Sequence, residues 1–376
     1  MNAIYRMGAI ACVLGGALLA TTHGESSKSS DEPHKFDTPI WNPKARWQIE
    51  RFAGCDARGH LDGPRLEMES FSPGVGSRAY QAMDGGGRYG FGCYDPGTGR
   101  GHLVAGSARG YLDGPFSRAR FGGWDYVVRG RSATSPEGRY YFFTDGYNGH
   151  VLRRLDYEKQ EVQTLLADTR SLKGMVPDSK GRLWLLKSDG ELICLMPDGK
   201  AEKGTRLSLE EKIGAWGVSL AIDEKNARIY ATTYGAAKWH VWFWDLKDGS
   251  FHGVLPIAAK DAPQRARNEA GPFEGVNLYN EGSVSFGPDD PDYRFLYVGR
   301  IDTWTFFRLD LKERHVWVLS PDGKNKGWEG QVVRFIDKGA PSGQLPCFGG
   351  GRWEEGGSFL GLSHSPFAGW RFKRIE

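Results

Sequence analysis

A duplicated segment near the start of the chain constrains the fold more than any other feature. Residues 53–64 read Ala-Gly-Cys-Asp-Ala-Arg-Gly-His-Leu-Asp-Gly-Pro, and residues 105–115 read Ala-Gly-Ser-Ala-Arg-Gly-Tyr-Leu-Asp-Gly-Pro. One residue of slippage aligns the two copies, which recur after about 51 residues. A period of this length is typical of a four-stranded unit that cannot bury its own faces and therefore stacks on its neighbours.

The composition favours many short strands joined by turns. The 376 residues include 53 Gly and 19 Pro, and 13% are aromatic, whereas no long segment has the apolar period of an amphipathic helix. Apolar runs separated by turns continue downstream, at residues 183–186, 192–196, 218–222, 229–232, 240–244, 295–298, 305–309 and 316–319. We therefore predict an all-β chain.

The second copy continues into a longer pattern. Residues 116–121 read Phe-Ser-Arg-Ala-Arg-Phe, and an apolar run at 140–145 ends in Asp145, followed by Asn148. Over residues 105–166 the chain resembles the NHL repeat, a β-propeller blade with an Asp-Gly-Pro-like turn, Ala-Arg-Phe, and an apolar strand that ends in Asp before an Asn. Later segments lack the Asp-Gly-Pro turn and the Asp-x-x-Asn hairpin. We expect structural roles for Asp145 and Asn148, which suit tight hairpins.

The resemblance and the repeats together predict a six-bladed β-propeller closed by an N-terminal strand. Residues 358–363 and 369–375 supply only the middle strands of a last blade, and residues 47–52 are expected to supply its missing outer strand. Such closure removes the exposed sheet edges that invite aggregation.

The N-terminal residues predict export. Arg6 precedes an apolar run of 14 residues, at 7–20, which is shorter than the roughly 20 residues of a membrane span. The expected organisation is a cleavable signal peptide at 1–24, a flexible tether at 25–43 and the propeller at 44–376. The destination would be periplasmic or extracellular, with no membrane span, and we expect a monomer.

The net charge and the cysteine spacing exclude some classes of partner and of metal site. The formal net charge is +3, which predicts no nucleic-acid partner. Four cysteines follow the leader, Cys55, Cys93, Cys194 and Cys347, and their spacing matches no metal motif. Their pairing is left open between buried thiols and a disulfide.

A repeated pattern marks candidate ligand-binding positions. Innermost propeller strands begin at one rim of the central channel, and a residue before Gly stands at the expected start of four such strands. These residues are Lys173, Trp216, Glu281 and Glu329, and Trp124 and Asn280 complete the candidate set. They predict a pocket for a small molecule, a carbohydrate or a protein at the propeller face.

Glu281 and Glu329 are also the candidate metal ligands. Two converging carboxylates could hold Ca²⁺ or divide acid and base roles. The alternative is that each carboxylate accepts hydrogen bonds from the rim. His150, His240 and His252 lack zinc-ligand spacing. Trp242 and Trp244 alternate on one strand face, which favours packing between blades over sugar stacking.

These observations favour an exported, NHL-type ligand- or protein-binding platform. The alternative is a hydrolase similar to the calcium-dependent gluconolactonases and arylesterases, six-bladed propellers related in fold, with its site at the central channel. The sequence leaves open whether the chain is an enzyme, because it contains no complete catalytic set.

Overall fold

The computed structural model describes strands and turns between residues 45 and 374. The described residues are 45–53, 63–64, 79–83, 89–94, 100–106, 110–122, 132–145, 151–206, 218–232, 239–256, 271–274, 276, 278, 281–287, 290–300, 306–319, 332–335, 351–353, 358–364 and 367–374. All belong to one compact unit, Phe36–Glu376. The predicted signal peptide and tether lie outside them.

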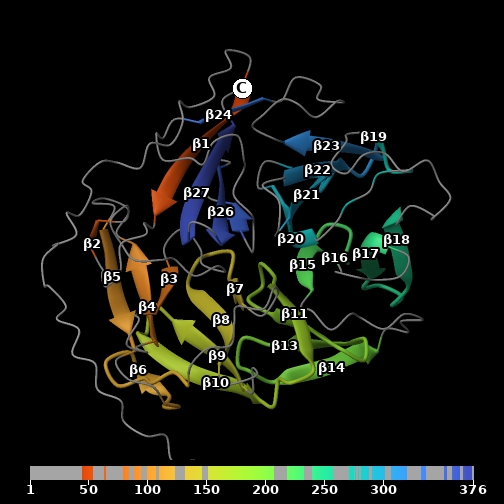
Figure 1. Ribbon diagram of the computed structural model, residues 1–376. Helices are drawn as coiled ribbons and strands as arrows, with labels where there is room; N and C mark the ends of the chain where they lie inside the picture. The colour runs from red at the N-terminus through yellow and green to blue at the C-terminus, as the bar shows by residue number, and fades with distance from the viewer. Residues whose placement is uncertain are drawn as a thin grey trace, which may run out of the picture. The chain divides into compact units, whose positions relative to one another are not determined.

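The described strands form six sheets, all of them built mainly from antiparallel neighbours (Figure 1). No helix occurs among the described residues, and so none there is long and apolar enough to cross a membrane. The prediction of an all-β chain is confirmed.

Strands that follow one another in the chain lie side by side within each sheet. The β3–β5 sheet has the order β2 (Gly63–Pro64), β5 (Arg100–Ala105), β4 (Tyr89–Tyr94), β3 (Ala79–Met83). The β7–β10 sheet has the order β6 (Gly114–Pro115), β10 (Glu161–Ala167), β9 (Val151–Asp156), β8 (Tyr140–Asp145), β7 (Ser132–Thr134). The β11–β14 sheet runs β11 (Leu172–Pro177), β12 (Leu183–Lys187), β13 (Glu191–Leu195), β14 (Ala201–Arg206).

The three remaining sheets have the same strand order, except that the last sheet also contains the N-terminal strand β1 and the strand β24. The β15–β18 sheet runs β15 (Ser219–Asp223), β16 (Arg228–Thr232), β17 (Trp239–Asp245), β18 (Phe251–Pro256). The β20–β23 sheet has the order β19 (Gly271–Pro272), β23 (His315–Leu319), β22 (Phe306–Asp310), β21 (Phe295–Arg300), β20 (Glu281–Phe286). The β25–β27 sheet has the order β24 (Val332–Phe335), β1 (Ala45–Ala53), β27 (Phe367–Arg374), β26 (Ser358–His364), β25 (Gly351–Trp353).

The N-terminal strand β1 lies where the sequence predicts it. It pairs antiparallel with β27, in a register that places Trp47 opposite Arg374 and Arg51 opposite Trp370. On its other side β1 pairs with β24, and this pairing is parallel. The predicted partnership between residues 47–52 and the last strand is confirmed, whereas the parallel neighbour was not predicted.

The first strand of one sheet contacts the first strand of the next. These contacts join β7 to β11, β11 to β15, β15 to β20 and β20 to β25. Two hydrogen bonds cross between sheets at these strands: the Val218 amide donates to the Lys173 carbonyl oxygen at 2.7 Å, and the Val284 amide donates to Ser219 Oγ at 2.9 Å. We call β7, β11, β15, β20 and β25 the inner strands.

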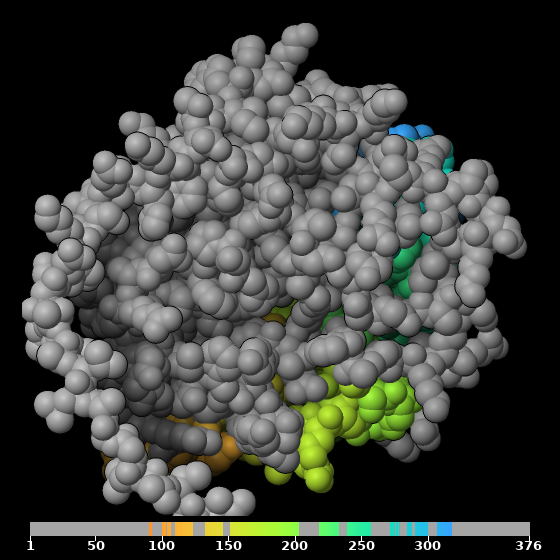
Figure 2. Space-filling model, viewed as in Figure 1, coloured from red at the N-terminus to blue at the C-terminus, as the bar shows by residue number. Residues whose placement is uncertain are grey.

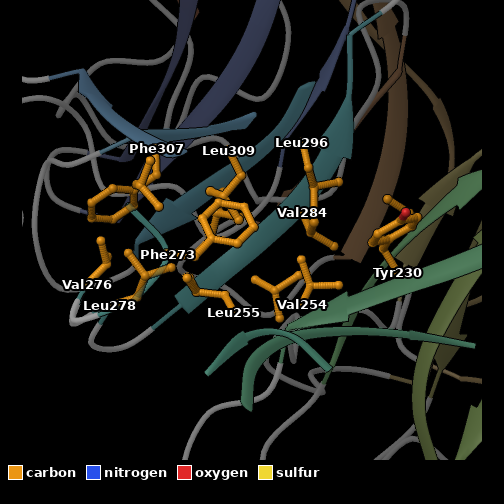
Figure 3. Close-up of a cluster of buried hydrophobic side chains, with 14 residues drawn as sticks. Tyr230, Val254, Leu255, Phe273, Val276, Leu278, Val284, Leu296, Phe307 and Leu309 are labelled. Carbon is orange, nitrogen blue, oxygen red and sulfur yellow. The ribbon is translucent and has the colours of Figure 1, made fainter. Parts of the chain in front are cut away.

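Apolar side chains fill the space between neighbouring sheets. Figure 3 shows one such cluster, in which Val254 and Leu255 of β18 pack with Leu296 of β21 and Leu309 of β22. Phe273, which follows the short strand β19, is fully buried in the same cluster. Similar clusters join the β3–β5, β7–β10, β11–β14 and β15–β18 sheets in succession, as the repeat predicts.

A buried arginine explains the motif of the second repeat. The Arg153 side chain is 1% exposed and pairs with Asp145 at 2.5 Å and with Asp113 at 2.8 Å. It also donates to the carbonyl oxygens of Leu112 and Arg120, both at 2.7 Å. Asp145 has a structural role: it binds the Arg153 side chain across the β8–β9 hairpin and accepts a hydrogen bond of 2.9 Å from the Gly122 amide, 23 residues away, rather than from its own turn. Asn148 lies outside the described residues.

The Gly-Pro element recurs in a later sheet, where the sequence analysis did not find it. The Phe116 amide, after Gly114-Pro115, donates to the Gln160 carbonyl oxygen at 2.8 Å, and the Phe273 amide, after Gly271-Pro272, donates to the Arg314 carbonyl oxygen at 2.9 Å. Gln160 and Arg314 share a left-handed backbone, with φ of 52° and 50°. The sequence pattern that marks this element is Gly-Pro-Phe. It was missed because residue 270 is Ala, whereas Asp precedes the Gly-Pro of the second repeat.

A second repeat links strand ends within sheets. Arg139 pairs with Asp156 at 2.9 Å, and Arg294 pairs with Asp310 at 2.5 Å. Burial alone would raise the pKa of Asp156 and Asp310, but the hydrogen bonds from the two arginines and from backbone amides hold both pKa values below the ordinary range. A looser copy, Arg228 with Asp245 at 3.6 Å, occurs in the β15–β18 sheet.

Candidate functional site

The starts of β11, β15 and β20 form the part of the candidate site that the structure describes. One inner-strand hydrogen bond joins Lys173 to Val218, and the other joins Ser219 to Val284 in the middle of β20. The strand β15 therefore contacts β11 on one side and β20 on the other. A ligand at this end would contact several sheets at once.

Lys173 is the predicted site residue whose side chain the structure describes. It is the second residue of β11 and is half-buried. Next to it, a Cβ on Gly174 would lie 2.4 Å from the Val218 carbonyl oxygen. Glycine is therefore needed here for the close approach of β11 to β15, and this approach fixes the position of the Lys173 backbone.

Glu281 begins β20, and its backbone pairs with Arg300 of β21. The backbone of Glu281 thus lies at the start of the inner strand β20, and its role in a ligand site stays a prediction. Its side chain, and the residues Trp124, Trp216, Asn280 and Glu329, lie outside the described part of the structure.

The strand that follows Glu329 differs from the prediction. Glu329 was expected to precede an innermost strand, but β24 lies at one edge of its sheet and the inner strand β25 lies at the other. The reason is that β1 pairs with β24 and so adds it outside the last sheet. The Glu-Gly sequence before residue 332 is thus not equivalent in topology to the one before residue 283.

Charged side chains that the sequence analysis did not select surround the start of β11. Asp168 has a left-handed backbone, with φ of 62°, and its carboxylate accepts two hydrogen bonds of 2.7 Å from the Arg170 guanidinium. Lys187 pairs with Glu191 at 2.5 Å across the β12–β13 hairpin, which is joined to this corner by the Ser188 amide and the Ser171 carbonyl oxygen at 2.7 Å. This end of the β11–β14 sheet is polar and carries both charges.

Metal-ligand clusters are not found in the described part of the chain. No group of three or more His, Cys, Asp or Glu side chains there could hold a metal ion. Calcium binding by Glu281 and Glu329 stays a prediction, and the position of β24 gives it no support.

The tryptophans of β17 serve packing, as predicted. Trp242 and Trp244 are 3% and 0% exposed, and their rings meet edge to face with centroids 4.1 Å apart. Trp239 covers Gly253 of β18, where a Cβ would lie 2.1 Å from a ring atom. Stacking on sugar rings is therefore not the role of Trp242 or Trp244.

Among the cysteines, the structure describes the side chain of Cys194. It is a free, buried thiol, and burial raises its pKa to about 11. Such a thiol is a poor nucleophile at neutral pH. Of the two alternatives for Cys194, a buried thiol or a disulfide, the structure shows the buried thiol.

Comparisons with known proteins identify the fold without a family. No protein-family model and no curated protein matches the chain. A protein of unknown function from Bacteroides thetaiotaomicron VPI-5482 is similar in structure, with a TM-score of 0.60 and 11% identity over 87% of this chain and 75% of that chain. Two auxiliary nutrient binding proteins are similar too. The one from the same strain has a TM-score of 0.57 and 12% identity over 87% and 76% of the two chains. The one from Bacteroides ovatus ATCC 8483 has a TM-score of 0.58 and 12% identity over 88% and 78%. The chain shares the fold of these proteins.

Proposed function

We propose that the chain is an exported binding protein whose ligand site lies where β11, β15 and β20 begin. The observation that carries the proposal is the hydrogen-bonded contact between neighbouring inner strands, because it joins Lys173 of β11 to the start of β15, and β15 in turn to β20. Ligand sites often form where several elements contribute a few polar groups each. The similarity in fold to auxiliary nutrient binding proteins supports binding as the activity.

The proposal includes a specific architecture, a six-bladed β-propeller closed by β1. It is supported by the six sheets among the described residues, by the succession of inner-strand contacts and by the pairing of β1 with β27. Deleting residues 44–53 should then expose the edge of β27 and cause aggregation, whereas deleting residues 25–40 should change little. If both deletions melt at the same temperature as the parent chain, closure by β1 is wrong.

The residue types at the site favour a small polar ligand, with carbohydrates first. Lys173 and Glu281 would supply one charge of each sign, and Trp124 and Trp216 would offer flat apolar faces of the kind on which sugar rings stack. Export is part of this proposal, and N-terminal sequencing of secreted protein tests it: cleavage is expected between residues 20 and 25. An uncleaved Met1 would contradict export.

A defined ligand panel tests the proposed site. Mono- and oligosaccharides are screened by thermal shift, and each hit is titrated by calorimetry against the parent chain and Lys173→Gln. Lys200→Gln is the matched control, because Lys200 lies in the same sheet but pairs with Asp198 in the exposed turn between β13 and β14. We expect Lys173→Gln to weaken binding about tenfold and Lys200→Gln to leave it unchanged. Equal affinities for all three proteins would overturn the site.

The calcium-dependent lactonase alternative has no support from the fold comparisons. Its metal would need Glu281 and Glu329 before equivalent strands, whereas β20 is an inner strand and β24 lies at the edge of its sheet opposite the inner strand β25. Elemental analysis of the mature protein after gel filtration tests this directly. Stoichiometric calcium would restore the alternative.

A further inference from the structure

Two adjacent apolar side chains project from the hairpin before β6. Tyr111 is 57% exposed and Leu112 is 43% exposed. Among the described residues the other large apolar side chain this exposed is Phe251, at 36%, in a different sheet. In Figure 2 orange atoms, the colour of the described residues between about 100 and 122, are visible at the lower edge of this view. Single exposed apolar residues are common, whereas a fixed pair calls for an explanation.

The backbone that carries this pair is held on every side. The Gly110 amide donates to the Phe121 carbonyl oxygen at 2.8 Å, and Leu112 and Arg120 exchange two hydrogen bonds of 3.2 and 3.1 Å. The buried Arg153 adds a third link, because it donates to the Leu112 carbonyl oxygen at 2.7 Å. These hydrogen bonds order the backbone that carries Tyr111 and Leu112 and connect it to the interior of the β7–β10 sheet.

One edge of the Tyr111 ring packs against Gly122, where a Cβ would lie 2.0 Å from a ring atom. The rest of the ring is exposed. Tyrosine is enriched among the residues that carry most of the binding energy of protein interfaces, because its ring offers a large contact area with few rotatable bonds.

The charge around the pair is positive. Arg118 and Arg120 are both exposed on the same hairpin. The nearby carboxylate of Asp113 is already engaged, since it accepts hydrogen bonds from Arg153 and from the Thr164 amide at 2.7 Å. An incoming group thus meets two arginines and an aromatic ring, which complement carboxylates and an apolar side chain.

We propose that Tyr111, Leu112, Arg118 and Arg120 form a docking surface for a protein segment that carries Asp or Glu beside an apolar residue. This surface lies outside the proposed ligand site, so that the chain would bind a partner protein and a small ligand at separate places. A membrane surface is the less suitable occupant, because stable attachment needs a larger apolar face or a longer cluster of basic residues than this hairpin presents.

A labelled peptide tests the docking surface. The probe is an eight-residue fluorescein peptide of alternating glutamate and leucine, measured by fluorescence anisotropy against the full mature chain. Two comparison peptides replace glutamate by lysine, or leucine by alanine. We expect the glutamate–leucine peptide to bind best, and its affinity to fall between about 50 mM and about 300 mM salt.

Variants of the chain assign the binding to this surface. Tyr111→Ser with Leu112→Ser, and separately Arg118→Glu with Arg120→Glu, should each weaken the peptide about tenfold. Phe251→Ser is the matched control, because it removes the other exposed large apolar side chain among the described residues, in a different sheet, and it should bind as the parent does. Since the apolar variants could disturb the hairpin, thermal melting of every variant is compared, and the arginine variants keep the test independent of that risk.

Three results would overturn the proposal. The first is no binding of the glutamate–leucine peptide, and the second is equal binding by the lysine–leucine peptide. The third is retention of the chain by anionic phospholipid vesicles that the same variants abolish, which would assign the surface to a membrane. None of these results bears on the saccharide titrations, so the two proposals fail separately.

Discussion

The β7–β10 and β20–β23 sheets have the same plan and stabilise it with opposite chemistry. In the first, Arg153 lies buried between the carboxylates of Asp113 and Asp145. In the second, the strand pairing puts Phe307, which is fully buried, at the position equivalent to Arg153. Residue 270, before the second Gly-Pro, is Ala where the first has Asp113. A charged network and an apolar cluster thus occupy the same place.

This difference indicates that the fold depends on the Gly-Pro backbone conformation and on a well-packed interior more than on these ion pairs. Buried charge networks often add little net stability over apolar replacements of similar volume, but they are costly to break partway. The two sheets should therefore respond very differently to loss of one arginine.

The largest expected effect is that of Arg153→Met. It leaves the nearly buried Asp145 without its cation, and we expect a loss of about 3–5 kcal/mol in the free energy of unfolding, measured in urea. Arg294→Met in the β20–β23 sheet is the control. The Arg294 side chain is 37% exposed, so its loss should cost about 1 kcal/mol or less. Similar losses for both would contradict the comparison.

The combined change Arg153→Phe, Asp113→Ala and Asp145→Ala sharpens the same comparison. It copies Phe307 and Ala270 of the β20–β23 sheet at two positions and removes the remaining buried carboxylate at the third, so it should be more stable than Arg153→Met by about 2 kcal/mol. If the triple variant is the less stable of the two, the sheets are not interchangeable.

The next effect concerns contacts between sheets rather than within one. Gly174→Ala places a Cβ against the Val218 carbonyl oxygen, a backbone atom that cannot turn aside, and we expect a loss of about 2 kcal/mol. Gly122→Ala is the control, because its Cβ would meet the Tyr111 ring, an exposed side chain that has room to move. Thermal unfolding of the two variants decides. An equally mild effect of both would mean that β11 and β15 are not tightly joined.

The pH dependence of stability in acid tests the contribution of the Arg–Asp pair that occurs in each of the two sheets. The pKa values of Asp156 and Asp310 are lowered in the folded chain, so the folded state binds fewer protons than the unfolded state as the pH falls. Their contribution, about 1 kcal/mol each, is present above the unfolded pKa near 4 and is lost below it. Asp310→Asn should flatten the pH dependence of stability between about pH 5 and pH 2. An unchanged profile would exclude the pair as its source.

The smallest expected effect comes from exchanging two stacked side chains. Tyr140 lies under Arg154 at 4.7 Å, and in the β15–β18 sheet Arg228 lies over Phe243 at 4.7 Å, with the cation and the ring in swapped positions. Arg228→Tyr or Phe243→Arg alone should cost about 1 kcal/mol, and the double variant should recover most of it. Strict additivity in urea unfolding would show that the swapped stacks are unrelated.

The sequence predicts the strands well because their apolar runs are short, alternating and bounded by turns. The runs at 183–186, 229–232 and 316–319 all lie in strands, and residues 47–52 pair with the last strand as expected. Pattern alone could not find the equivalence of Asp113–Arg153 and Ala270–Phe307, because the two sets share position but no chemistry.

The candidate site was harder to predict for a topological reason. A residue before Gly at the start of a strand says nothing about which edge of a sheet that strand occupies. Lys173 is the second residue of the inner strand β11 and Glu281 is the first of β20, whereas the similar segment at Glu329 comes before β24, which lies outside the N-terminal strand. The outer position of β24 depends on its pairing with β1, between residues almost 300 positions apart in the sequence.

The most direct test of the account is a double-mutant cycle between Lys173 and Glu281 on ligand affinity. Lys173→Gln, Glu281→Gln and the double variant are titrated by calorimetry with the best saccharide from the panel, and their melting temperatures are compared. If both side chains face one ligand, each single change weakens binding about tenfold, and the double variant loses clearly less than the product of the two. Unchanged affinities, or losses that multiply strictly and follow the melting temperature, would contradict a shared site at the inner strands.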